Sequence, residues 1–207
     1  MTILPLTYLG NIEYYRLLYS GGCVIDLYEN YVKQSFRNRC EIMTSGGRAS
    51  LTVNVVKGGS IHKKTMRDIR IDYSKRWQHQ HWLSLLSAYR NSPYFEHYGE
   101  LFEPFYTQHY EFLADLNIGL METMFRILGR PEDMIFSKEY VRTSETDTDY
   151  RGLLKPSGMP LSDSINAIYN EYYQVFSEKI PFEPNLSIID LIFCEGPLAV
   201  NYVRGNL

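Results

Sequence analysis

Residues 3–27 read ILPLTYLGNIEYYRLLYSGGCVIDL, and this stretch decides the fold class. It opens with the apolar run Ile3–Leu9 and closes with a second apolar run, Cys23–Leu27, and both have the length and composition of buried strands. Between them the apolar residues recur at helical spacing, Asn11 can cap the helix, and two glycines end it. A strand, a helix and a strand of these lengths predict a parallel unit with a right-handed crossover.

The rest of the chain supplies further strands and then mostly helices. The predicted fold class is α/β, with a small, mostly parallel sheet from the N-terminal half packed with helices and a helical C-terminal half. We expect a single domain over 1–207, with a lid or linker loop at 143–163 and a small helical C-terminal lobe at 164–207. Apolar spacing and turn residues predict strands at 50–56, 66–73 and 134–136, and helices at 77–89, 94–110, 113–128, 165–176 and from Ser187 to Gly196.

Composition limits the classes of function. The chain has 207 residues, 44% of them hydrophobic, and a formal net charge of −3, which argues against nucleic acid as the main partner. Three cysteines at unrelated spacings predict no disulfide framework. No secretory leader and no membrane span are expected, so the sequence predicts a cytoplasmic protein.

Residues 26–42 read DLYENYVKQSFRNRCEI and hold an unusual density of polar side chains directly after the second strand. Ligands of parallel sheets bind beyond the carboxyl ends of the strands. Guanidinium and ammonium groups suit a carboxylate or a phosphate, and amides and hydroxyls can fix its orientation. We therefore expect a site for an anion, with candidate ligands Asn30, Tyr31, Lys33, Ser35, Arg37, Asn38 and Arg39.

Each candidate has a structural alternative. Asp26 could act as a base or orient a cationic group, or it could cap the following turn. The basic residues could hold an anion, or they could form a solvated loop paired with Glu29 and Glu41. Ser35 suits an anion ligand or a turn residue, because no nucleophile elbow surrounds it.

Two further residues have chemistry of their own. His81 could be a general base, or a half-buried histidine satisfied by one hydrogen bond. His79 and His81 cannot share one helical face, so no metal site is predicted. Cys40 follows the arginines and could be an activated nucleophile, or simply a small apolar residue that starts a strand.

Several motifs in order resemble the WbqC-like protein family. They include Pro5-x-x-Tyr8, a strand ending in Asp26, Asn30-Tyr31-x-Lys33-x-Ser35-x-Arg37-Asn38-Arg39, the pair His81-Trp82, and Ser92-Pro93-Tyr94-Phe95. The resemblance implies a role in O-antigen or surface-polysaccharide biosynthesis, where a glycine-transferase role has been suggested for relatives.

On that basis we expect a transferase of a small acyl or aminoacyl group, with Asp26 and His81 as catalytic residues. The substrate would be an anionic small molecule or a sugar-linked anion. The alternative is a non-catalytic ligand-binding or assembly protein of the same pathway. The cofactor and a homo-oligomeric state are left open by the sequence.

Overall fold

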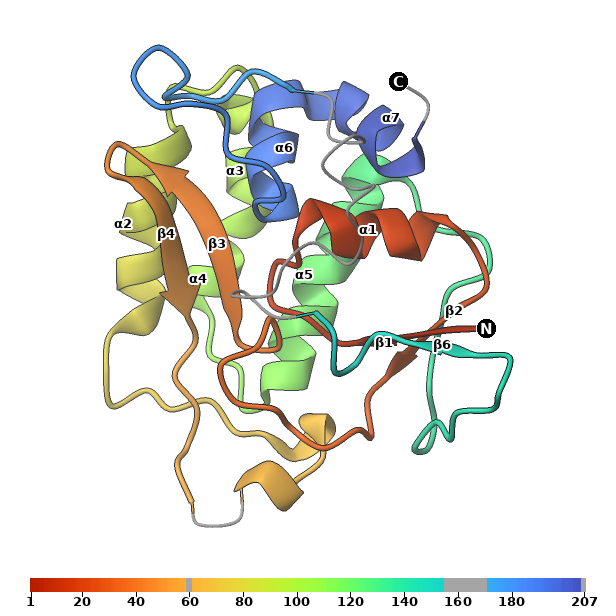
Figure 1. The fold of residues 1–207 in the computed structure, drawn as a ribbon. Coiled ribbons are helices and arrows are strands. Elements are labelled where there is room, and N and C mark those ends of the chain that lie inside the picture. The colour runs from red at the N-terminus through yellow and green to blue at the C-terminus, as the bar shows by residue number, and fades with distance from the viewer. Residues whose placement is uncertain (59–60, 155–170, 206–207) are drawn as a thin grey trace.

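A four-stranded parallel sheet forms one end of the molecule. The computed structural model describes residues 1–58, 61–154 and 171–205 (Figure 1). The sheet has the order β5-β2-β1-β6, and all three pairings are parallel. Ile3 pairs with Val24 and Pro5 with Asp26, so the two central strands end at the same edge. The strands are β1 (Thr2–Pro5), β2 (Cys23–Asp26), β5 (Ile135–Phe136) and β6 (Thr148–Asp149).

The predicted crossover between the two central strands is confirmed. It is α1 (Ile12–Tyr19), and the Asn11 side chain accepts a hydrogen bond from the Tyr14 amide at 3.0 Å. This bond satisfies one of the free amides at the start of a helix. Gly22 follows with a φ of +62°, which glycine adopts readily, and the chain enters β2.

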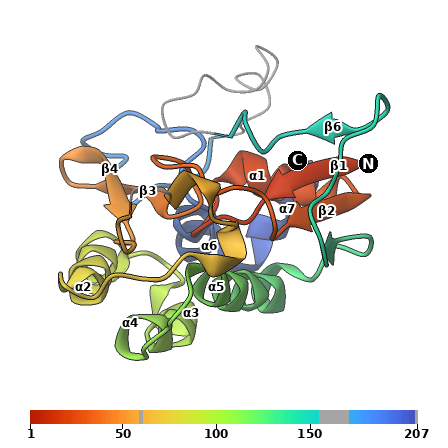
Figure 2. The same ribbon diagram turned by 90° about the horizontal axis from the view of Figure 1, so that it is seen from below.

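A separate antiparallel hairpin lies at the other end of the molecule, beside α2 (Figures 1 and 2). It consists of β3 (Arg39–Thr44) and β4 (Gly47–Thr52), with Cys40 opposite Leu51. The predicted strand at 50–56 therefore starts earlier and ends at Thr52. The α/β class is confirmed, although the hairpin is not part of the parallel sheet.

The predicted strand at 66–73 was wrong over its first half. Residues Met66–Asp68 form a short 3₁₀ helix, and a second one lies at Ile61–Lys63. The buried side chains Met66 and Ile69 are three residues apart, which is the spacing of one 3₁₀ turn. The strand prediction relied on the alternation of Ile69, Ile71 and Tyr73 and did not take this spacing into account. Only single bridges remain beyond them, such as Val55 with Ile71.

The helices predicted in the middle of the chain are confirmed. The longest begins at Leu113, and Gly129 ends it with a φ of +80°. In the view of Figure 1 it lies at the back of the molecule, between the hairpin and the parallel sheet. These helices are α2 (Trp77–Tyr89), α3 (Phe95–Phe102), α4 (Pro104–Thr107) and α5 (Leu113–Leu128).

The C-terminal half is helical as predicted, but its connecting segments differ. The Ser187 hydroxyl caps α6 (Ile188–Glu195), which a 3₁₀ turn and α7 (Ala199–Arg204) follow. The prediction of a helix at 165–176 was wrong for residues 171–176, which have no regular secondary structure up to 174 and form a turn from 175; its other residues lie outside the described part. The loop predicted at 143–163 contains β6 and is described only to 154, so its role as a lid stays a prediction.

The two ends of the molecule share one core of buried aliphatic and aromatic side chains. Leu4 and Ile25 of the parallel sheet, Ile42 of the hairpin, Leu116 of α5 and Ile192 of α6 all belong to it and are fully buried. Within the described ranges, no helix is both long and apolar enough to cross a lipid bilayer.

Candidate functional site

Charged side chains gather where the parallel strands end. Asp26 is the last residue of β2 and Asp149 the last of β6, and parallel pairing puts both at one edge of the sheet. A turn after residue 32 returns Arg37 to this edge, opposite Glu29. We call Asp26, Glu29, Arg37, Asp149 and Arg151 the strand-end cluster.

Asp26 is the anchor of the cluster. Its carboxylate accepts hydrogen bonds from the amides of Tyr28 at 2.9 Å and Val141 at 3.2 Å, and from the Ser137 hydroxyl at 3.2 Å. It also forms an ion pair with Arg151, and its side chain is fully buried. A carboxylate with four donors holds its neighbours in place through charge-assisted hydrogen bonds. Asp26 therefore combines both sequence interpretations: it orients a cationic group and it caps a turn.

The guanidinium group of Arg37 is paired inside the protein. Its Nε donates to Glu29 Oε1 at 2.9 Å and its Nη2 to Glu29 Oε2, while another Nη2 bond reaches the Arg151 carbonyl at 2.9 Å. Nη1 donates to the Ser35 hydroxyl at 3.2 Å. Arg37 is 1% exposed. Its charge is thus already balanced, and a ligand anion would have to compete with Glu29.

The Glu29 carboxyl is buried, both of its oxygens accept hydrogen bonds from Arg37, and its pKa is shifted toward neutrality. Burial raises the pKa of its carboxyl from 4.5 to about 7, although the charge and hydrogen bonds of Arg37 oppose that rise. Asp26 adds a further negative charge nearby and acts in the same direction as burial. A carboxyl group that titrates near neutrality can take up or release a proton at physiological pH.

The outer end of the cluster is open to solvent at Asp149. Arg151 donates to it from Nε at 3.0 Å and from Nη2 at 2.6 Å. Burial would raise the pKa of Asp149, but the hydrogen bonds from Arg151 outweigh burial and lower that pKa. The Asp149 side chain is 33% exposed. The cluster has three carboxyl groups and two guanidinium groups, so an incoming cation or a proton would balance it.

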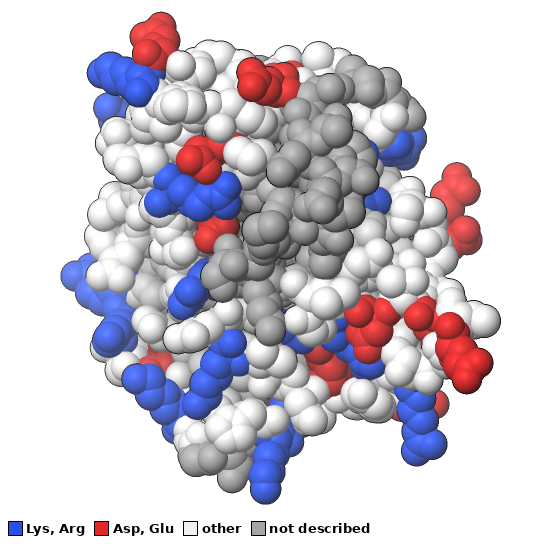
Figure 3. All heavy atoms as spheres, viewed as in Figure 1, with Lys and Arg blue, Asp and Glu red and all other residues white. Residues whose placement is uncertain are grey.

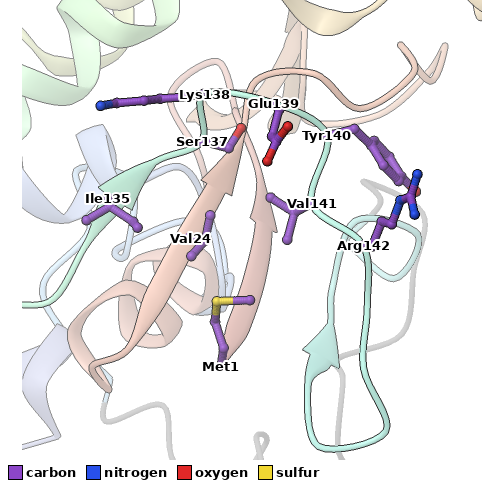
Figure 4. A pocket seen from close by; sticks show the side chains of 9 residues that line it. All are labelled: Met1, Val24, Ile135, Ser137, Lys138, Glu139, Tyr140, Val141 and Arg142. Carbon is purple, nitrogen blue, oxygen red and sulfur yellow. The ribbon is translucent and has the colours of Figure 1, made fainter.

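A cavity of about 680 Å³ adjoins the cluster on the face of the sheet (Figure 4). Two of its lining residues, Ser137 and Val141, hydrogen bond to Asp26. In Figure 4 the Glu139 carboxylate points toward the strands, whereas Lys138 extends away from them. The cavity is lined by Met1, Val24, Ile135, Ser137, Lys138, Glu139, Tyr140, Val141 and Arg142.

The predicted anion ligands do not converge on one point. Asn30 and Lys33 are exposed on the loop after β2, whereas Tyr31 is buried and the Ser35 hydroxyl donates to the Val32 carbonyl at 2.6 Å. Asn38 donates to the Val53 carbonyl at 2.8 Å and Arg39 to the Thr52 hydroxyl at 3.1 Å, so both face the hairpin. Only Asp26, Ser35 and Arg37 of the predicted residues meet at the strand ends.

His81 belongs to a different buried group. Its Nδ1 lies 2.9 Å from the Tyr8 hydroxyl, which lies 3.1 Å from the Tyr106 hydroxyl, and its ring packs edge-on against Trp77. Burial lowers the pKa of His81 to about 4, so the imidazole is neutral at physiological pH. The side chain is 5% exposed, which fits the interpretation of a satisfied, buried histidine.

Cys40 is completely buried in the same region. Burial raises the pKa of its thiol above the usual range, and the neighbouring Glu41 adds to the effect. The arginines do not lower that pKa as a nucleophile would require, because Arg37 pairs with Glu29. Cys40 is a core residue of β3. In the described part of the chain, no three His, Cys, Asp or Glu side chains are placed to hold a metal ion together.

Three members of the cluster were missed by the sequence interpretation. Asp149 and Arg151 lie in a polar stretch, and the strand that the structure describes there is two residues long, so no alternation marks it. Glu29 was considered only as the partner of a solvated loop. A signal was nonetheless present, because Glu29 and Arg37 flank a turn and have opposite charges.

The fold and the cluster define an α/β protein with a charged site at the carboxyl ends of a parallel sheet. The chain belongs to the WbqC-like protein family, whose model matches residues 7–155. It is similar to the "Uncharacterized protein Rv1507c" of Mycobacterium tuberculosis (strain ATCC 25618 / H37Rv), with 28% identity over 84% of each chain. No solved structure gives a significant match.

Proposed function

We propose that the chain is a transferase that attaches a small acyl or aminoacyl group, glycine being the first candidate, to a sugar in surface-polysaccharide biosynthesis. Membership of the WbqC-like family supports the pathway, through the O-antigen role that the resemblance implies. The main support for an acyl-transfer reaction is the Glu29 carboxyl at the strand ends, whose pKa is raised to about 7.

Acyl transfer needs a base at the attacking atom. As the amine or hydroxyl of the acceptor attacks the acyl carbon, a new C–N or C–O bond forms and Glu29 takes the proton. The bond from the acyl carbon to the leaving group breaks, and the leaving group departs with the electron pair. A base whose pKa lies near the working pH is suited to this proton transfer.

The other members of the cluster would bind and position the substrates. Asp149 is charged and accessible, so it would pair with the ammonium group of an amino sugar or an amino acid. Asp26 fixes Arg151 and would act by positioning rather than by taking a proton. Lys33 and Asn30 are exposed on the loop after β2 and would meet an anionic part of the donor.

The cavity beside Asp26 would receive the sugar. Its volume of about 680 Å³ lies within the range of small-molecule sites, roughly 300–1,000 Å³. Its lining combines apolar side chains with a few polar ones, as sites for amphipathic ligands do.

The alternative is a non-catalytic ligand-binding or assembly protein of the same pathway. One observation favours this alternative. The polar atoms of Asp26 and Arg37 already hydrogen bond to protein groups, including the Val141 amide and the Arg151 carbonyl. Such bonds are expected of residues that stabilise the fold.

A thermal-shift screen tests the proposal. The panel contains glycine, ATP with glycine, acyl-CoA thioesters, and nucleotide-linked amino sugars. A ligand at about 100-fold its Kd adds about 2.7 kcal/mol, which raises the Tm of a chain of this size by several degrees. We expect an amine-bearing compound to raise the Tm of the wild type and of Asp133→Asn, an exposed control, and to have little effect on Asp149→Asn.

A shift that survives in Asp149→Asn would put the ligand elsewhere on the molecule. If a binding compound is turned over, Glu29→Gln should lower kcat by more than it raises KM, since only the proton transfer loses its acceptor. Binding without turnover in any combination of donor and acceptor would favour the alternative.

A further inference from the structure

Positive charge is concentrated in one segment of this chain. The whole chain has a formal net charge of −3. Residues 57–76 nevertheless carry many more basic than acidic side chains: Lys57, Lys63, Lys64, Arg67, Arg70, Lys75 and Arg76 against Asp68 and Asp72. The remainder of the chain therefore has an excess of acidic side chains, and the two signs of charge are separated along the sequence rather than interspersed.

The fold adds the loop after β2 to this segment. The amide of Tyr31 donates to the Lys64 carbonyl at 2.9 Å, and the amide of Met66 donates to the Glu29 carbonyl at 2.8 Å. These bonds hold the loop that carries Lys33 beside the segment that carries Lys63 and Lys64. Figure 3 shows Lys and Arg gathered at the lower end of the molecule, where Figure 1 draws this segment.

We call Lys33, Lys57, Lys63, Lys64 and Arg67 the basic surface. All five side chains are exposed. None of them takes part in the ion pairs seen among the described residues, whereas Arg70 is paired with Glu111. Arg67 donates a hydrogen bond to the Tyr28 hydroxyl, which leaves its charge without an anionic partner. Exposed cations without anionic partners repel one another, and an external anion relieves that repulsion.

Two aliphatic side chains lie among these cations. Val32 precedes Lys33 and is 38% exposed, and Val56 precedes Lys57 and is 50% exposed. Isolated exposed valines are ordinary. Flanked by unpaired cations, however, they match the two demands of a bilayer surface, which offers anionic headgroups and an apolar layer beneath them.

We propose that the basic surface docks this protein reversibly on an anionic lipid bilayer. The charge separation supports a flat, one-sided contact, because the acidic remainder of the chain would be repelled by the same surface. A nucleic acid is the weaker candidate, because it offers no apolar layer to the exposed side chains of Val32 and Val56. The proposal stands on these surface residues alone, and it can hold or fail independently of the proposed reaction.

Co-sedimentation with vesicles tests the proposal. We expect the wild type to bind vesicles of phosphatidylcholine with phosphatidylglycerol, to ignore phosphatidylcholine alone, and to be released by salt. Each cation near an anionic surface changes the partition coefficient by about fivefold. The double variant Lys63→Glu/Lys64→Glu should therefore bind at least about 25-fold more weakly.

The control is Arg126→Glu/Lys179→Glu, which changes the net charge equally at exposed positions outside the basic surface. It should bind like the wild type, and both variants should keep the wild-type Tm. Equal loss in the two double variants, or no binding of wild type to anionic vesicles, would overturn the proposal. Preferential binding of an RNA oligonucleotide over the vesicles would also overturn it and assign the surface to nucleic acid.

Discussion

Arg37 illustrates what a single residue in the sequence can and cannot reveal. Its type and its neighbours Ser35 and Asn38 predicted a ligand for an anion. In the structure its guanidinium group is bound by Glu29, which lies eight residues earlier. The pairing depends on a turn between the two residues, and no periodic pattern encodes that turn. The sequence therefore indicated where charged residues gather, but not which of their charges are already paired inside the protein.

His81 gives a prediction at the same scale. Its pKa is lowered to about 4 in the folded protein, whereas an unfolded histidine titrates near 6.5. Between these values the unfolded chain binds a proton that the folded one does not, so the stability contributed by His81 is complete above pH 6.5 and is lost as the pH falls through 4. From pH 7.5 to pH 5 the wild type should lose about 2 kcal/mol more than His81→Asn.

Urea unfolding at several pH values measures this difference. The matched control is His79→Asn, an exposed histidine of the same helix, which should follow the wild type. Parallel stability curves for wild type and His81→Asn would show that burial does not disfavour the imidazolium form.

At the scale of elements, the segment 171–187 is held by side chains rather than by its own secondary structure. The hydroxyl groups of Tyr172 and Tyr89 donate to the Asp190 carboxylate of α6 at 2.6 and 2.7 Å. Gln174 bonds to both the amide and the carbonyl of Glu183. Burial raises the pKa of Asp190 to about 6, although the tyrosine hydrogen bonds oppose the rise.

Replacing Asp190 should therefore release this segment. In Asp190→Asn an amide nitrogen faces a tyrosine hydroxyl that had donated to an oxygen, and an unsatisfied buried donor costs about 1–3 kcal/mol. We expect a lower Tm and faster tryptic cleavage at Lys179, within the segment. Glu178→Gln, an exposed control nearby, should be cut at the wild-type rate. Equal rates for all three proteins would mean that the tyrosine contacts do not hold the segment.

Elements with a strong pattern of their own were predictable from sequence. The helix Leu113–Leu128 has many apolar side chains at helical spacing and a glycine at its end. β6 and the 3₁₀ turn Met66–Asp68 were not predictable, because two or three residues contain no full period of either pattern. The helix expected at 171–176 failed for another reason: its tyrosines are used for tertiary hydrogen bonds instead.

For the whole molecule, the sequence indicated the α/β architecture and the edge of the sheet where the strand-end cluster gathers. The first strand, helix and strand fixed the parallel order, and the carboxyl ends followed from it. The composition of the site depended on contacts between distant parts of the chain, such as Arg151 with Asp26. The same holds for the basic surface, which joins residue 33 to residues 57–67 through backbone hydrogen bonds.

The central claim is that Glu29 is a carboxyl group poised to exchange a proton near neutral pH at the strand ends. NMR titration of protein labelled with ¹³C at the glutamate carboxyl carbons measures this directly, without a substrate. We predict one resonance with a midpoint near 7 that is absent in Glu29→Gln and unchanged in Glu178→Gln. A spectrum in which every glutamate titrates near the ordinary value of about 4.3 would contradict the account.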